Sequence, residues 1–206
     1  MEEYNFSHFN DIIRHLKNKN IGIIPTETTY GICGIAMPLD LEVRNKIYDI
    51  KKRNFSKNLV LQISQDFDIL KIVGEINSVA KKLMDNFFPG PLTLVFKASD
   101  EFIINYSWNI DTVAIRIPNH KFLLNLLKAV KMPVFVTSAN ISGEKVNNNF
   151  DYLKNKFINK IDFIVRNDKS LNENLPSTII DVCDKKIKIL RHGSISEYDI
   201  MKTINN

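Results

Sequence analysis

Short polar segments close the apolar runs of this sequence, and they hold most of the side chains that could do chemistry. The segments are PTETTYG, KKRNFSK, TVAIRIP, TSANISG, PSTIID and ILRHG. In an open α/β sheet, ligands bind outside the strand ends, where loops bring side chains and free backbone N–H groups together. We therefore expect strand-end loops that are distant in the chain to converge on one binding site.

Lys51 and Arg53 are candidates for binding an anion. In an extended segment, their i, i+2 spacing points both side chains to the same side. The pair could then hold a polyphosphate, with arginine as a bidentate donor and lysine as a compact charge. Basic residues in the last turn of a helix also complement the helix dipole, so a structural role is the alternative for both.

Two turns are rich in hydroxyl and amide groups. Ser138, Asn140, Ser142 and Gly143 could bind phosphate oxygens or a ribose, or they could form hydrogen bonds within the turn itself. The three threonines and the glutamate of residues 26–29 could line a cavity or cap a helix. The segments alone leave these alternatives open.

Arg116 differs from the other basic residues because it lies inside an apolar strand segment. An isolated guanidinium is costly to bury, so Arg116 needs an anionic partner. The partner is either an internal carboxylate or the carboxylate of a small substrate.

The elements that position these residues follow from the spacing of apolar side chains. This spacing predicts helices over residues 9–16, 41–50, 77–87 and 122–130, the second one capped by Asp40. Apolar and β-branched runs predict strands over 21–24, 59–63, 92–96, 112–117, 133–137, 161–165, 178–182 and 187–190. Strands that alternate with helices and later follow one another closely predict an α/β protein. We expect an open mixed sheet with flanking helices in a single domain over residues 1–206.

The composition is that of an ordinary globular protein, with 44% hydrophobic and 25% charged residues. The net charge of +5 is spread along the chain and favours anionic ligands only weakly. Two cysteines without CxxC spacing indicate neither a disulfide framework nor a zinc site. A start without a secretory signal and the lack of a membrane-span pattern predict a cytoplasmic protein without a membrane partner.

Several smaller features have structural interpretations. We predict that residues 167–176 form a mobile surface loop and that Trp108 is a core residue. The asparagine run at 147–149 could reflect a compositional drift of the genome. The histidines lack metal-ligand spacing and are predicted to lie on the surface or at helix caps; they are His8, His15, His120 and His192.

Together, the polar segments resemble the YrdC-like threonylcarbamoyl-AMP synthase family, in the short form without an extra C-terminal domain. The resemblance covers about residues 22–194 and includes FFPGPLTLVF and the K-x-R of Lys51 and Arg53, with the motifs in the family's order. It implies an open, twisted α/β sheet with a concave, positively lined cavity.

The resemblance also implies roles for individual residues. The residues implied in catalysis are Lys51, Arg53, Ser138 and Asn140. The residues implied in threonine binding are Thr26, Gln62, Arg116, Val136 and Ser177. The residues implied in ATP binding are Arg53, Lys57, Thr112, Ser138, Val146 and Arg191. The sequence departs from the family pattern at Asn54, His192 and Val146, so that a contact to ATP from Val146 would come from its backbone.

The resemblance implies that the amine of L-threonine combines with bicarbonate or CO2 to give a carbamate, which then attacks the α-phosphorus of ATP. The products are pyrophosphate and threonylcarbamoyl-AMP, the activated intermediate for tRNA modification. We expect a nucleotidyltransferase whose Mg2+ is carried by the ATP phosphates, because the sequence has no Asp/Glu cluster that would form a cage. Further expected partners are tRNA or other RNA and downstream threonylcarbamoyl transferase proteins.

Two other functions compete with this expectation. A non-enzymatic RNA-binding protein would use the same basic cavity and would bind RNA in a salt-sensitive way. A carbamoyl-transfer module of the kind found in hydrogenase maturation proteins is disfavoured, because the chain lacks the zinc-finger and acylphosphatase-like segments expected beside it.

Overall fold

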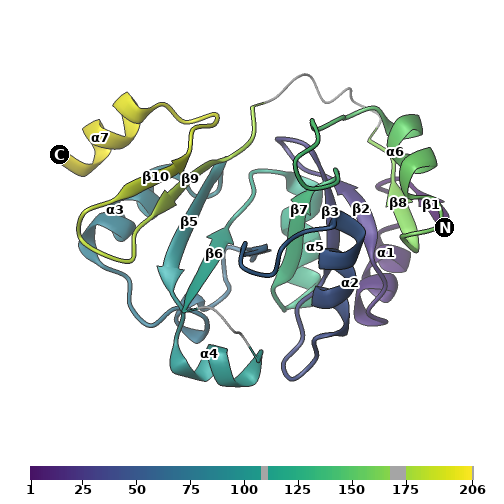
Figure 1. The fold of residues 1–206 in the computed structure, drawn as a ribbon, viewed down its shortest axis with the longest axis horizontal. Coiled ribbons are helices and arrows are strands. Elements are labelled where there is room, and N and C mark those ends of the chain that lie inside the picture. Colours follow the sequence, from purple (N-terminus) through teal and green to yellow (C-terminus); the bar gives the residue numbers. More distant parts are fainter. Residues whose placement is uncertain (108–110, 168–174, 206) are drawn as a thin grey trace.

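The computed structural model describes residues 1–107, 111–167 and 175–205, and a ten-stranded sheet organises them (Figure 1). The strands are β1 (Glu2–Tyr4), β2 (Gly22–Pro25), β3 (Tyr30–Ile35), β4 (Val60–Gln62), β5 (Leu92–Lys97), β6 (Thr112–Arg116), β7 (Val134–Ser138), β8 (Phe163–Val165), β9 (Thr178–Asp181) and β10 (Lys188–Arg191). The helices are α1 (Phe9–Lys17), α2 (Glu42–Lys51), α3 (Ser78–Phe87), α4 (Asp100–Asn105), α5 (Lys121–Val130), α6 (Phe150–Phe157) and α7 (Glu197–Asn205), with a 3-10 turn η1 (Ile69–Lys71).

The sheet is mixed and open, as the sequence predicts. The strand order is β1-β8-β2-β3-β7-β4-β6-β5-β9-β10. The pairs β1–β8, β2–β8, β4–β6 and β5–β9 are parallel, and the other neighbours are antiparallel. Figure 1 shows α3 and α7 together at the β10 end, and α6 with the N-terminus at the β1 end. The predicted fold class is therefore confirmed.

The helices begin where the sequence supplies capping side chains. Asn77 and Ser99 accept backbone N–H groups at the start of α3 and α4, and His120 does so at the start of α5. Asp40 lies one residue before the cap of α2 and accepts the Glu42 N–H at 2.8 Å. Helices α2, α3 and α5 therefore start close to the predicted positions, whereas α4 was not predicted.

His15 contradicts the prediction that it lies on the surface or at a cap. It is only 8% exposed, and its ring lies 5.0 Å from that of Phe163. Its Nδ1 and Nε2 are hydrogen-bonded to the side chains of Asn20 and Tyr4. It faces inward from α1, beside Ile12 and Leu16 of the core.

Strand β3 is absent from the prediction because two glycines interrupt its apolar pattern. A Cβ at Gly31 would lie 2.5 Å from Val136 Cγ1, and one at Gly34 would lie 2.4 Å from Val43 Cγ1. Glycine is therefore required where β7 and α2 pack closely against this strand.

The asparagine run has a local structural role that favours it over compositional drift. Asn149 caps α6 by accepting the Tyr152 N–H at 2.9 Å, and Asn147 accepts the Asn149 N–H at 2.8 Å. Asn148 accepts the N–H of Tyr30 at 3.1 Å. Trp108 and residues 168–174 of the loop predicted over 167–176 lie outside the described residues. None of the helices in the described ranges has the length and apolarity needed to traverse a bilayer.

Candidate active site

A cavity of about 550 Å³ lies over the sheet and is lined by every strand from β3 to β10 in sheet order. The predicted site residues that line it are Thr26, Arg53, Gln62, Thr112, Arg116, Val136, Ser138, Asn140, Val146, Ser177 and Arg191. Much of its floor is the face of the sheet, for example Gln62 of β4 beside Arg116 of β6. The expectation that the site lies at strand-end loops is therefore incomplete.

The lining carries an excess of positive charge. Among the described lining residues, Arg53, Arg116 and Arg191 are basic and Asp181 is acidic, which gives a formal charge of 3 − 1 = +2. A concave wall of one sign concentrates its field in the cavity. The cavity is thus suited to an anionic ligand.

Arg53 is held by neutral backbone acceptors. Its Nε donates to the Lys57 carbonyl at 3.1 Å, and its Nη2 donates to the Asn58 carbonyl at 2.8 Å. Burial lowers the pKa of this guanidinium, because removal from water disfavours its charged form. The side chain is therefore oriented without having its charge neutralised.

Arg191 is held in the same way at the other side of the cavity. Its Nε and Nη2 donate to the Ser177 carbonyl at 3.0 and 2.8 Å, and Nη2 also donates to Ser177 Oγ at 2.8 Å. The backbone at Gly193 packs closely against the backbone of residues 176–178, since a Cβ at Gly193 would lie 2.2 Å from the Pro176 carbonyl oxygen. Burial and the charges of Arg116 and Arg53 lower the pKa of Arg191.

Arg116 has an internal anionic partner, the first of the two alternatives left by the sequence. Its Nη2 lies 2.7 Å from Glu27 Oε1, and its Nε donates to the Gly90 carbonyl at 3.1 Å. Its Nη1 donates to Thr28 Oγ1 at 3.2 Å. The guanidinium is 6% exposed as a side chain, so the charge is compensated inside the protein before any ligand binds.

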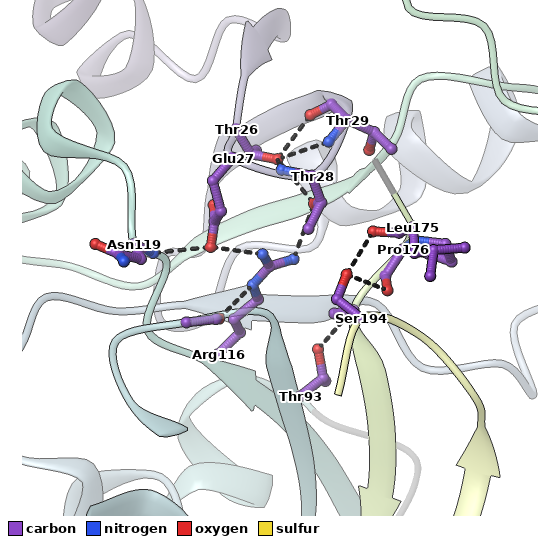
Figure 2. A network of polar contacts seen from close by, with 12 residues as sticks. Thr26, Glu27, Thr28, Thr29, Thr93, Arg116, Asn119, Leu175, Pro176 and Ser194 are labelled. Carbon is purple, nitrogen blue, oxygen red and sulfur yellow. Dashed lines mark hydrogen bonds and ion pairs between the residues drawn. The ribbon is translucent and has the colours of Figure 1, made fainter. Parts of the chain in front are cut away.

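Thr26 lines the cavity, but its hydroxyl is used within its own turn (Figure 2). Thr26 Oγ1 donates to the Thr29 carbonyl at 2.7 Å and accepts the N–H groups of Thr28 and Thr29, both at 3.1 Å. The segment therefore lines the cavity, and the helix-cap alternative is wrong, because the hydroxyl closes a turn that leads into strand β3.

Lys51 does not line the cavity but supports its wall from behind. It is 1% exposed, and its Nζ donates to the carbonyls of Ser138 and Asn140 at 2.5 and 2.8 Å. Asn140 Oδ1 lies 3.3 Å from Nζ and accepts the Ser138 hydroxyl at 2.6 Å. Burial and the charge of Arg53 lower the pKa of Lys51 to about 7.

The predicted shared orientation of Lys51 and Arg53 is wrong. Lys51 is the last residue of α2, and Lys52 adopts the left-handed conformation with φ 48° before Arg53 follows. The segment is thus not extended, and the two cations face different surroundings. Lys51 donates to a neighbouring turn and does not line the cavity, and it is also the basic residue in the last turn of α2, as the structural alternative predicted.

The remaining predicted ATP residue, Lys57, is exposed and outside the lining, while its carbonyl accepts the hydroxyl of Tyr48 at 2.9 Å. The departure at Asn54 has a local explanation, because Asn54 Oδ1 accepts the Ser56 N–H at 2.8 Å and shapes the turn that a proline would otherwise fix. The side chain of His192 is exposed.

Several residues of the site are missing from the sequence prediction. Asn58 lines the cavity and donates from Nδ2 to Thr112 Oγ1 at 3.0 Å, and Thr93 Oγ1 lies 2.9 Å from Ser177 Oγ. Asp181 lines the far part of the cavity. The available signal was a polar side chain inside an apolar strand segment, which holds for Thr93 and for Asp181.

Comparison with known proteins agrees with the family resemblance found in the sequence. Residues 14–193 match the model of the Sua5/YciO/YrdC family, which bears the description "telomere recombination". A Methanocaldococcus jannaschii protein is 33% identical over 185 residues, which make up 88% of this chain and 84% of that protein. The threonylcarbamoyl-AMP synthase of Pyrococcus abyssi is 32% identical over 180 residues, 87% of this chain but 52% of that protein. The chain thus spans about half the length of this relative.

Solved structures share the fold. Pyrococcus abyssi Sua5 complexed with L-threonine superposes with a TM-score of 0.87 at 28% identity, covering 98% of this chain and 60% of that one. Escherichia coli YciO superposes with a TM-score of 0.82 at 20% identity over 95% of each chain, a likeness of fold alone. On these matches and the cavity above, this chain is a member of the Sua5/YciO/YrdC family.

Proposed function

We propose that this chain is a threonylcarbamoyl-AMP synthase, a nucleotidyltransferase that uses L-threonine, bicarbonate or CO2 and ATP. The observation that carries the proposal is a single positively lined cavity of about 550 Å³, within the usual size of small-molecule sites. It brings a paired arginine on the sheet together with two arginines held by neutral acceptors. The similarity to a threonine-bound relative supports the choice of amino acid.

The amino-acid substrate is proposed to bind around Arg116, Ser177 and Gln62. The described contacts use three of the five guanidinium N–H groups of Arg116, so one on each terminal nitrogen can bind a carboxylate. Gln62 is 2% exposed, and its Oε1 lacks a hydrogen-bond partner among the described residues. A buried acceptor left in this way gains from a ligand N–H donor such as the threonine amine.

ATP is proposed to bind along the wall formed by Arg53, Ser138, Asn140 and Arg191. The two arginines carry charge that no carboxylate among their described contacts neutralises, so phosphate oxygens can supply the missing anion. Ser138 and Asn140 come from the turn that Lys51 holds in place. Thr112 and Val146 line the same cavity.

The chemistry proposed for this site needs no protein nucleophile. A carbamate oxygen attacks the α-phosphorus of ATP, the bond between that phosphorus and the bridging oxygen to the β-phosphate breaks, and pyrophosphate leaves. Positioning of the reactants and fixed charges around the phosphoryl oxygens would carry the rate. Magnesium would enter with the ATP phosphates. The product is a mixed anhydride of threonylcarbamate and AMP, from which threonylcarbamoyl transferase proteins would transfer the threonylcarbamoyl group to tRNA and release AMP.

The proposal is tested by measuring pyrophosphate release with ATP, magnesium, bicarbonate and L-threonine, and then omitting threonine or bicarbonate. Release that depends on both supports the synthase. RNA binding that falls with salt, together with no pyrophosphate release under any of these conditions, would support the competing RNA-binding function. Arg53→Gln should reduce turnover strongly, whereas Arg14→Gln, at a side chain that is 66% exposed, should leave it unchanged.

A further inference from the structure

Glu27 holds a place in the site that neither the predicted threonine contacts nor the predicted ATP contacts include. One of its oxygens, Oε1, accepts both the Arg116 Nη2–H at 2.7 Å and the backbone N–H of Asn119 at 2.8 Å. Figure 2 shows the side chain reaching down from the threonine turn to both donors. Glu27 therefore joins the loop between β2 and β3 to the segment that follows β6.

The contact with Glu27 is the shortest of the three that orient the Arg116 guanidinium. The Gly90 carbonyl lies 3.1 Å from Nε, and Thr28 Oγ1 lies 3.2 Å from Nη1, compared with 2.7 Å to Glu27. All three contacts have the charged guanidinium as donor, but only the contact with Glu27 also has a charged acceptor, so it is the strongest of the three. Glu27 is therefore the main determinant of the plane in which the guanidinium lies.

The threonine turn fixes the other terminal nitrogen. The Thr26 hydroxyl donates its only proton to the Thr29 carbonyl. In the 3.0 Å contact between the Thr26 and Thr28 hydroxyls, Thr28 is therefore the donor. Thr28 Oγ1 is then free to accept from Arg116 Nη1. The hydrogen bonds run in one direction from the arginine to the turn, and this order leaves the arginine a single stable orientation.

We propose that Glu27 is a positioning residue, which holds the Arg116 guanidinium so that its two remaining N–H groups face the cavity and receive the carboxylate of the amino-acid substrate. This inference rests on the proposed function. Because arginine presents its donors in a rigid planar arrangement, fixing one terminal nitrogen also aims the others. Glu27 would act on the substrate only through Arg116.

Charge explains why the positioning residue is a carboxylate. Before substrate binds, Glu27 compensates a guanidinium that would otherwise be buried alone at high cost. The substrate carboxylate then adds a second negative charge near the same arginine. Arg191 lies close enough to Arg116 for the two cations to influence each other, so it can balance that added charge.

The test compares Glu27→Ala with Glu27→Gln by measuring kcat and the KM for threonine and for ATP. We expect Glu27→Ala to raise the threonine KM by about 10- to 100-fold, since a hydrogen bond to a charged group is lost, while the ATP KM changes by less than about 3-fold. Glu27→Gln should have a threonine KM between those of the wild type and Glu27→Ala, because its amide oxygen can accept the same two N–H groups but does not compensate the buried charge, and its ATP KM should stay within about 3-fold of the wild type. Glu42→Ala, which removes an exposed glutamate paired with Lys46, is the matched control.

Three outcomes would overturn the proposal. They are an unchanged threonine KM in Glu27→Ala, an equal rise in the ATP KM, and a Glu27→Gln variant as impaired as Glu27→Ala. If thermal unfolding shows that Glu27→Ala is not folded, Glu27→Asp carries the same test, because its carboxylate is withdrawn by one methylene. Wild-type enzyme that releases no pyrophosphate would instead refute the proposed function itself.

Discussion

Replacing Lys51 by methionine should destabilise the protein by about 2–4 kcal/mol. Methionine keeps most of the apolar stem but removes the donors that now reach the carbonyls of Ser138 and Asn140 at 2.5 and 2.8 Å. Each buried acceptor left without its partner costs about 1–3 kcal/mol. The loss is partly offset because burial already disfavours the charge of Lys51, as its pKa of about 7 indicates. Two acceptors would together cost about 2–6 kcal/mol, and we expect a loss in the lower half of this range.

Urea denaturation followed by circular dichroism measures this difference, and the corresponding fall in Tm should be about 5–15 °C. Lys46→Met is the matched control on the same helix, because the Lys46 side chain is 55% exposed and its ion pair with Glu42 contributes at most about 0.5 kcal/mol. The Lys51 variant should also lose turnover, since the turn that carries Ser138 and Asn140 is no longer held. Equal stability of the two variants would refute the supporting role assigned to Lys51.

Further predictions concern pH, packing and selectivity. Because the Lys51 pKa is lowered from 10.5 to about 7, the unfolded chain binds one proton more than the folded chain between these values. The unfolding free energy of the wild type should therefore rise with pH over this window, by up to about 1.4 kcal/mol per unit, and Lys51→Met should lack this rise in parallel urea titrations. Gly193→Ala should raise the threonine KM at least about 10-fold and lower Tm, because its Cβ would lie 2.2 Å from the Pro176 carbonyl and displace Ser177; unaltered kinetics would contradict the packing. In competition assays, serine should be disfavoured by only about 1–3 kcal/mol, whereas turnover of valine comparable with that of threonine would argue against a polar threonine site.

The fold could be predicted wherever the apolar periodicity was uninterrupted. The helices over Phe9–Lys17, Ser78–Phe87 and Lys121–Val130 lie within a residue or two of their predicted bounds. Strand β3 could not be predicted, since Gly31 and Gly34 are required by close packing against Val136 of β7 and Val43 of α2, which the sequence alone does not reveal. Tertiary packing decided the residue type at these positions against local propensity.

The site shows the same division between local and distant information. The motifs identify most residues of the cavity, but they do not identify the partners of these residues. Glu27, the partner of Arg116, is 89 positions away in the chain, and the residues that bind Lys51 are 87 and 89 positions away. Sequence spacing could therefore indicate that Arg116 needs an anion but could not identify Glu27 as that anion. It also could not show that Lys51 works from behind the wall, because this depends on the left-handed residue at Lys52.

Arg191 belongs to β10, the last strand in both the chain and the sheet. During synthesis on the ribosome, the earlier strands can emerge and pair while this arginine is still missing from the cavity. A nascent chain at that stage would also lack the guanidinium that donates hydrogen bonds to the Ser177 carbonyl. Competence to take up substrate should therefore arise only after β10 has been synthesised, when most of the sheet can already have formed.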